Sequence, residues 1–218
     1  MSLFIHRERF PRLVKRCPVS FTLIVLITLA YLFDLITLRK ILFYHGALVP
    51  ARVINDGEYH RLILPIFIHA SIFHLFFNVF FGIAVLGAGL EKLIGSVKYA
   101  LVFFLSALGA SLLVTFVNIH YTPYQATIGA SGGIYGVLGV FLYVILFRKD
   151  LIFVSDRQYL AGLIMINVVF TLIWRDISIL GHFGGLITGF IIGFFLFLPG
   201  ISDRLYHRKL RRQWRELK

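Results

Sequence analysis

Long apolar runs separated by short polar segments dominate this 218-residue chain. Runs of about 18 residues or more are long enough to cross the roughly 30 Å hydrocarbon core of a bilayer as helices, because backbone groups in lipid must pair within the segment. The pattern predicts six transmembrane helices, of which the fourth and fifth are the shortest. Their predicted bounds are 19–38, 72–90, 97–119, 132–147, 159–174 and 179–198.

The composition also indicates a membrane protein. Hydrophobic residues make up 59% of the chain and charged residues only 15%, against about 25% charged in ordinary soluble domains. A water-soluble core could not bury this much apolar surface. We therefore interpret residues 1–218 as one all-α membrane domain, with a basic N-terminal tail (1–18), a six-helix core (19–198) and a basic C-terminal tail (199–218).

The distribution of Lys and Arg predicts the orientation of these helices, since such residues concentrate in cytoplasmic loops and tails. Of the 22 Lys and Arg residues, seventeen fall in the two tails and in the loops on the same side, and five fall on the opposite side. Both termini are therefore expected in the cytoplasm. Because the charge lies in short tails beside hydrophobic spans, the net charge of +12 does not indicate nucleic-acid binding. The single cysteine, Cys17, cannot form an intramolecular disulfide.

The longest segment between predicted helices, residues 39–71, is unusually apolar for a loop. Such a loop is expected to lie in the membrane interface or to pack on the helix bundle. Long loops in compact domains are often functional.

Four polar residues fall near the starts of helices that run in the same direction. His74 and Asn78 lie in the first two turns of the second helix, Ser131 opens the fourth, and His182 lies in the first turn of the sixth. At 1.5 Å rise per residue, each lies within about 10 Å of its helix start. The four residues can therefore share one layer near the outer membrane surface.

These residue types supply the parts of a serine hydrolase. Ser131 would be the nucleophile and His182 its general base. The side-chain N–H groups of His74 and Asn78, with the backbone N–H of Ser131, could stabilise the negative charge of a tetrahedral intermediate.

An acidic residue to orient His182 is not evident. Asp34 and Asp176 are the nearest candidates, but one lies on another helix and the other in a predicted loop. We therefore predict a Ser-His dyad. Tyr135, four residues after Ser131, could hold the imidazole by stacking.

Small residues suggest how the fourth and sixth helices approach each other, because stripes of small residues let helix backbones pack closely in lipid. Read alone, residues 129–133 (Gly-Ala-Ser-Gly-Gly) could serve packing only. A soluble nucleophile elbow is excluded, because it needs a strand-to-helix turn and this chain has no parallel-sheet pattern. The stripes are Gly132, Gly136 and Gly139 on the fourth helix and Gly181, Gly185, Gly189 and Gly193 on the sixth.

Taken together in this order and spacing, the motifs resemble those of a rhomboid intramembrane serine protease over about residues 20–198. They are Gly129-Ala130-Ser131-Gly132, His69-x4-His74-x3-Asn78, and Gly181-His182-x2-Gly185-x3-Gly189. Residues 57–61 are similar to the first-loop signature of the family, with Tyr59-His60 in place of its Trp before Arg61. Residues 89–92, which contain Glu91, resemble its acidic motif, and Gly181 replaces a common Ala.

The resemblance implies the prokaryotic six-helix form, with Ser131 and His182 as the catalytic dyad. It also implies an oxyanion hole formed by His74, Asn78 and the Ser131 amide, with Gly129 in a supporting role. Transmembrane protein substrates would be cleaved near the outer membrane face, in a prokaryotic plasma membrane. Membrane lipid is the other expected partner, and no cofactor or metal is expected.

Two other classes of protein remain as alternatives. One is a non-catalytic rhomboid-like protein that binds transmembrane helices without cutting them. The other is a haem- or metal-binding membrane protein that uses His74 and His182. Against the second, His69 and His74 would point about 140° apart on one helix.

Overall fold

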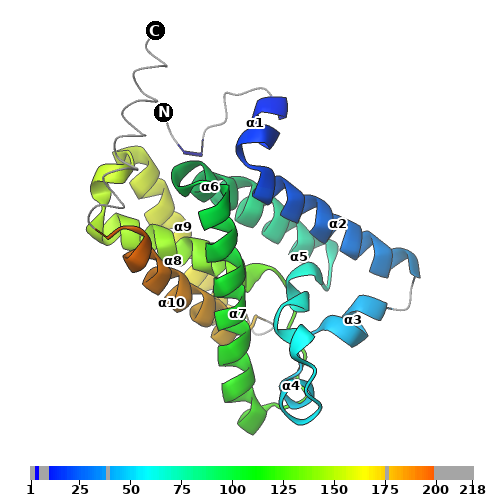
Figure 1. Cartoon of the computed structure of the whole chain (residues 1–218). Coiled ribbons are helices and arrows are strands. Elements are labelled where there is room, and N and C mark those ends of the chain that lie inside the picture. Colours follow the sequence, from blue (N-terminus) through cyan, green and yellow to red (C-terminus); the bar gives the residue numbers. More distant parts are fainter. Residues whose placement is uncertain (1–2, 5–9, 38–39, 175–176, 199–218) are drawn as a thin grey trace.

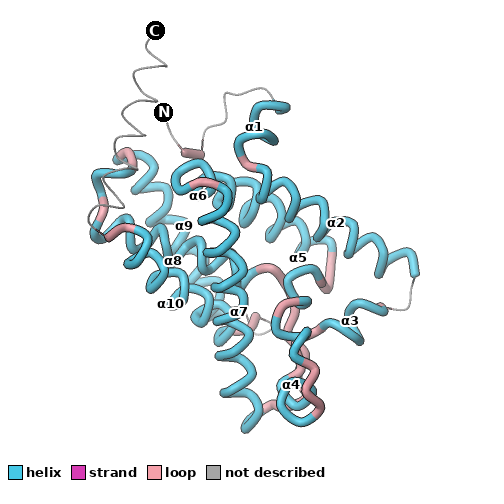
Figure 2. The backbone as a smooth tube through the Cα atoms, viewed as in Figure 1, coloured by secondary structure: helices cyan, strands magenta, loops and turns pink. Residues whose placement is uncertain are grey.

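The computed structural model describes residues 3–4, 10–37, 40–174 and 177–198, and every named element in these ranges is helical (Figures 1 and 2). The predicted C-terminal tail lies outside the described residues, while part of the predicted N-terminal tail forms a helix, α1. The elements are α1 (Phe10–Arg16), α2 (Pro18–Thr37), α3 (Ile41–Gly46), α4 (Pro50–Asn55), η1 (Tyr59–Leu62), η2 (Leu64–Phe67), α5 (Ile72–Phe76), η3 (Phe77–Gly87), α6 (Ala88–Ile94), α7 (Ser96–Tyr121), α8 (Ser131–Phe147), η4 (Lys149–Leu151), α9 (Val154–Ile173) and α10 (Ile179–Leu196).

Each of the six predicted apolar stretches is helical, and the all-α membrane fold is confirmed, while the crossing of the membrane by all six stays a prediction. Within the described residues, five helical stretches are long and apolar enough to cross a membrane: α2, the continuous stretch Ile72–Ile94, α7, α9 and α10. The sixth, α8, has 17 residues. The cytoplasmic placement of both termini stays a prediction.

Helix α8 occupies the centre of the bundle, which accounts for its short length. Its residues from Gly133 to Phe141 are all buried. At 1.5 Å per residue the helix is only about 26 Å long. Neighbouring helices rather than lipid therefore surround its middle, while Leu146 and Phe147 at its C-terminal end are exposed.

The predicted contact between the fourth and sixth helices is confirmed, and it is the most extensive helix contact in the described part of the chain. A Cβ at Gly185 would overlap the Gly132 carbonyl oxygen, and one at Gly189 would overlap that of Gly136. Backbone therefore meets backbone along this line. That approach is what the glycine stripes allow.

The second span changes its winding along its length. It begins as the short α-helix α5, continues as the π-helix η3 and ends as α6. Such widened turns occur often at functional positions. Asn78 is the second residue of the π-helical stretch.

The prediction for the fifth span was wrong at its start. Helix α9 begins at Val154, five residues before the predicted start at residue 159, and has 20 residues. Its first turn contains Asp156 and Arg157, which lower the hydropathy of a stretch that is nevertheless helical. Only Asp156, Leu160 and Thr171 are buried on this helix. Most of α9 therefore faces away from the protein.

The long first loop folds into four short helical segments, α3, α4, η1 and η2, and its predicted packing on the bundle is confirmed. Leu48 and Val53 form a buried cluster with Val114 of α7. Figure 1 shows α4 beside the C-terminal end of α7, at the opposite end of the molecule from α1.

Glu91, the acidic residue of the motif that ends the second span, has a structural role. Its carboxylate accepts hydrogen bonds from the backbone N–H of Val19 (3.0 Å) and Ser20 (2.8 Å) and from the Ser20 hydroxyl (2.7 Å). These N–H groups are the first of α2 and have no acceptor within their own helix. Glu91 therefore caps α2 from α6.

Candidate active site

The N-terminal ends of α5, α8 and α10 meet at one level of the bundle. Gly129 has φ +115°, and a Cβ on it would lie 2.8 Å from His74 Nε2 and 3.8 Å from Ser131 Oγ. A Cβ on Gly132 would lie 3.8 Å from the carbonyl oxygen of Gly181, the residue before the predicted base. The structure thus gathers the starts of these three helices into the single layer that the sequence predicts.

Ser131 is the first residue of α8, and its side chain is partly exposed. Its backbone N–H lies in the first helical turn, where no acceptor within the helix is available. Within the described residues, Ser131 Oγ makes no hydrogen bond to His182. The Ser131 amide, at the start of α8, is therefore available to an acceptor from outside the helix.

His182 lies against the face of α8 that carries Ser131. The predicted stacking of Tyr135 on His182 is present, with ring centroids 3.9 Å apart and an interplanar angle of 22°. Tyr135 is one turn along α8 from Ser131, so the two side chains project from the same face. The imidazole is 9% exposed.

Helix α9 also contacts the imidazole of His182. Thr171 Oγ1 lies 2.8 Å from His182 Nδ1 and 2.5 Å from the hydroxyl of Tyr135. Nothing in the sequence pattern singles out a threonine in an apolar helix, so Thr171 was missed. Its role depends on which face of α9 is turned towards His182, and only the structure shows this.

The two acidic candidates considered for orienting His182 do not take that role in the described structure. Asp34 accepts hydrogen bonds from the backbone N–H of Leu42 (2.8 Å) and Phe43 (3.2 Å), and so caps α3. Asp176 lies outside the described residues.

His74 and Asn78 lie on one face of the second span. The hydroxyl of Ser71 caps α5 by accepting a hydrogen bond from the His74 backbone N–H at 3.2 Å. Asn78 Nδ2 donates to the His74 carbonyl oxygen at 2.8 Å, and its buried Oδ1 has no partner. An amide has two N–H donors, so one remains for a ligand.

His69 is buried close to His74. It precedes α5 rather than lying on it, and its ring packs on that of His74, with centroids 4.8 Å apart. The 140° separation expected on a helix therefore does not apply. Burial, with a smaller contribution from the charge of His74, lowers the pKa of His69 to about 3. His69 is therefore neutral at physiological pH, and its ring packs against His74 as an uncharged neighbour.

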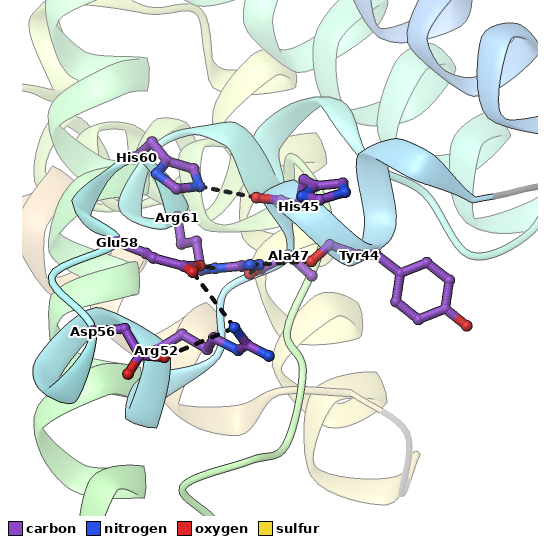
Figure 3. Close-up of polar contacts among 8 residues, drawn as sticks. All are labelled: Tyr44, His45, Ala47, Arg52, Asp56, Glu58, His60 and Arg61. Carbon is purple, nitrogen blue, oxygen red and sulfur yellow. Dashed lines mark hydrogen bonds and ion pairs between the residues drawn. The ribbon is translucent and has the colours of Figure 1, made fainter.

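The first loop is organised around Arg61, which is only 3% exposed (Figure 3). Its guanidinium donates to the carbonyl oxygens of Ala47 (2.8 Å) and Tyr44 (3.0 Å), and pairs with Glu58. This pairing, with further charges from Arg52 nearby, lowers the pKa of the Glu58 carboxyl. The buried guanidinium thus joins three residues of the loop, Tyr44, Ala47 and Glu58.

A second contact closes the same loop. His60 Nε2 donates to the carbonyl oxygen of His45 at 2.9 Å (Figure 3). Tyr59-His60 is the pair that replaces the Trp of the similar signature, and through His60 a hydrogen bond fastens η1 to α3.

The first loop also holds the segment that leads to Ser131. Leu48 and Thr127 exchange backbone hydrogen bonds of 3.0 and 2.8 Å, and the Gly129 N–H donates to the Pro65 carbonyl oxygen at 2.9 Å. Because Gly129 is two residues from Ser131, these contacts fix the approach of the chain to α8.

A metal centre has little support from the donor groups. In the ranges that the structure describes, no three His, Cys, Asp or Glu side chains are grouped as metal ligands. His69 and His74 are ring neighbours, but a third such donor does not join them.

Comparison with known proteins finds related sequences over most of the chain. The sequence model of the Rhomboid domain matches residues 56–199. YdcA of Bacillus subtilis is 28% identical over 194 residues, which cover 88% of this chain and 95% of YdcA. The rhomboid protease GluP of the same bacterium is 35% identical over 147 residues, 67% of this chain but only 28% of GluP. Inactive rhomboid protein 1 of Papio anubis is 33% identical over 149 residues, 66% of this chain and 16% of that protein.

Proposed function

The chain belongs to the rhomboid family, and we propose that it is an intramembrane serine endopeptidase with Ser131 as nucleophile and His182 as general base. It is an integral multi-pass membrane protein. One observation carries the proposal: the Tyr135–His182 stack seats the imidazole against the face of α8 that bears Ser131. Nucleophile and base then belong to two helices whose backbones touch.

The chemistry follows from these two groups. His182 Nε2 takes the proton of the Ser131 hydroxyl as Oγ attacks the carbonyl carbon of the scissile peptide bond. The resulting tetrahedral intermediate collapses when His182 gives that proton to the departing amine and the C–N bond breaks. Water, deprotonated by the same imidazole, then hydrolyses the ester and regenerates Ser131.

The negative oxygen of the intermediate needs hydrogen-bond donors. The Ser131 amide is available at the start of α8, where the helix dipole also favours negative charge. His74 Nε2, which Gly129 approaches closely, and the second N–H of Asn78 are the other donors. Removal of one such donor from other serine hydrolases costs on the order of 10²- to 10³-fold in kcat.

The substrate class follows from the surroundings of the site. Apolar helices enclose it, so the protein that reaches Ser131 is itself embedded in the membrane. With Lys and Arg concentrated around the tails, the site lies towards the outer face of a prokaryotic plasma membrane. Transmembrane proteins are cleaved there.

The test is cleavage of single-span substrates by purified protein in lipid vesicles. Wild type should yield two fragments from at least one substrate, and Ser131→Ala and His182→Ala should yield none. Ser155→Ala and His120→Ala are matched controls, because both residues are exposed and lie outside the site. These controls should cleave as wild type does.

A fluorophosphonate probe supplies a second readout, because it reacts only with an activated serine. Wild type should be labelled and Ser131→Ala should not. If wild type is neither labelled nor able to release fragments from any substrate in the panel, the protein is a non-catalytic binder of transmembrane helices and the proposal is overturned.

A further inference from the structure

Thr171 is the one buried hydroxyl on α9, a helix that is otherwise largely exposed, and it contacts the imidazole of His182 directly. Its Oγ1 is 2.8 Å from the Asn167 carbonyl oxygen, 2.5 Å from the Tyr135 hydroxyl and 2.8 Å from His182 Nδ1. The Tyr135 hydroxyl is also 2.9 Å from the Asn167 carbonyl oxygen. Four short polar contacts therefore meet in a site closed to solvent.

The number of protons available decides how these contacts are made. The Thr171 and Tyr135 hydroxyls carry one proton each, and the carbonyl oxygen of Asn167 can only accept. If His182 Nδ1 carries no proton, only the two hydroxyl protons are available, so at most two of the four contacts are hydrogen bonds. If Nδ1 is protonated, three contacts are satisfied, since Nδ1–H and the Tyr135 O–H donate to Oγ1 while Thr171 donates to Asn167.

The first arrangement leaves close oxygen and nitrogen lone pairs facing each other in a buried place, which is costly. The second gives Thr171 Oγ1 two donors and one acceptor, its full hydrogen-bonding capacity. Donation from a threonine to the carbonyl four residues earlier is also the usual habit of this side chain in a helix.

We propose that Thr171 is a positioning residue that holds His182 as the Nδ1–H tautomer, which leaves the Nε2 lone pair to accept the Ser131 proton. The proposal rests on the proposed function and deepens it, because it names the group that orients the base. A hydroxyl here takes the place that an acidic side chain has in a Ser-His-Asp triad. It fixes the tautomer without burying a charge.

Three variants separate orientation from packing. Thr171→Val keeps the shape but removes the hydroxyl, and should lower kcat roughly 10- to 100-fold with little change in KM. Thr171→Ser restores the hydroxyl and should recover most of the activity. Thr188→Val is the matched control, because Thr188 makes the same hydrogen bond to the carbonyl four residues earlier, at 2.8 Å, and lies away from His182.

The tautomer itself is read by nitrogen NMR of histidine-labelled protein, with the His182 signals assigned by their loss in His182→Ala. Wild type and Thr171→Ser should show a protonated Nδ1, and Thr171→Val should show a mixture of tautomers. A protonated Nε2 in wild type, or a Thr171→Val protein with wild-type kcat or an unchanged tautomer, overturns the proposal.

The two proposals fail differently. If wild type cleaves nothing but its His182 carries the proton on Nδ1 and loses this preference in Thr171→Val, the assignment of Thr171 stands and the protease function falls. If wild type cleaves and the three threonine variants cleave equally, the protease function stands and the assignment of Thr171 falls.

Discussion

Gly189 of α10 packs directly on the backbone of Gly136 in α8, so closely that any side chain at position 189 would overlap the Gly136 carbonyl group. Gly189→Ala should force the two helices apart and destabilise the protein by about 1–3 kcal/mol. Cleavage should fall as well, because His182 and Ser131 lie on the separated helices. Unfolding in mixed micelles and fragment yield measure the two effects.

Gly162→Ala on α9 is the matched control for this substitution, because nothing lies within 4 Å of a Cβ built there. It should leave the protein as stable as wild type, or more stable by about 0.5–1 kcal/mol. Equal destabilisation by both variants would contradict the close approach of α8 and α10.

Gly129 combines two constraints, a positive φ of +115° and the closeness of His74. Gly129→Ala should cost stability through backbone strain, about 1–3 kcal/mol. It should also push His74 Nε2 from its position and lower kcat, on the order of 100-fold. Turnover and thermal unfolding of the same sample give both numbers.

Gly57→Ala isolates the backbone strain. Gly57 also has a positive φ, +70°, but nothing lies within 4 Å of its Cβ position. The variant should lose stability and keep its turnover. If Gly57→Ala and Gly129→Ala lower kcat equally, the collision with His74 is not the cause.

Arg61 holds the first loop, and through that loop the segment before Ser131. Arg61→Lys cannot reach both carbonyl oxygens and Glu58 from one ammonium group. The variant should be less stable by about 1.5–3 kcal/mol for a lost charge-assisted hydrogen bond. Limited proteolysis within residues 40–71 should become faster, and cleavage of substrate slower.

Arg52→Lys is the matched control, because it makes the same change of side chain at the other arginine near Glu58. Arg52 is exposed, and its contacts to Glu58 (3.5 Å) and Asp56 (3.8 Å) are long. The variant should change stability by less than about 0.5 kcal/mol. A larger loss than that of Arg61→Lys would shift the anchor of the loop from Arg61 to Arg52.

His69 gives the fold a dependence on pH. The pKa of His69 is about 3 in the folded protein, against an ordinary value of 6.5. Between these two pH values the His69 imidazole is protonated in the unfolded chain and neutral in the folded protein. Protonation of His69 therefore costs no free energy of unfolding above pH 6.5. Below pH 6.5 the free energy of unfolding decreases by about 1.4 kcal/mol per pH unit for this one group. The measurement is the free energy of unfolding against pH.

His69→Phe keeps an aromatic ring beside His74 and removes the titrating group. Its stability should depend less on pH in this window than that of wild type. His120→Phe, at an exposed position, should leave the dependence unchanged. A wild-type slope in His69→Phe would assign the pH dependence to another group.

The sequence predicts the parts of this fold that lipid imposes. Apolar runs give the six helices, and the glycine repeats give the contact of α8 with α10, because both depend on local composition. The start of α9 was misplaced because Asp156 and Arg157 are polar although helical. The four short segments of the first loop were not predicted, since they depend on Arg61 reaching backward to Ala47 and Tyr44.

The candidate site shows the same division. Ser131, His182, His74 and Asn78 were identified because polar residues at matching ends of apolar helices are conspicuous. Thr171 was not, because its importance depends on how α9 is turned and on its neighbours from two other helices. The position of His69 against His74 likewise depends on where α5 begins, which a pattern of hydropathy does not fix.

Helix α9 has one further consequence. Most of its surface faces outward and only three of its residues are buried, yet one of them contacts the imidazole. Lipids are therefore the principal neighbours of the helix that contacts His182. For the proposed base, a change in the bilayer that shifts or turns α9 would move Thr171 against the imidazole, so the membrane would become part of the environment of His182.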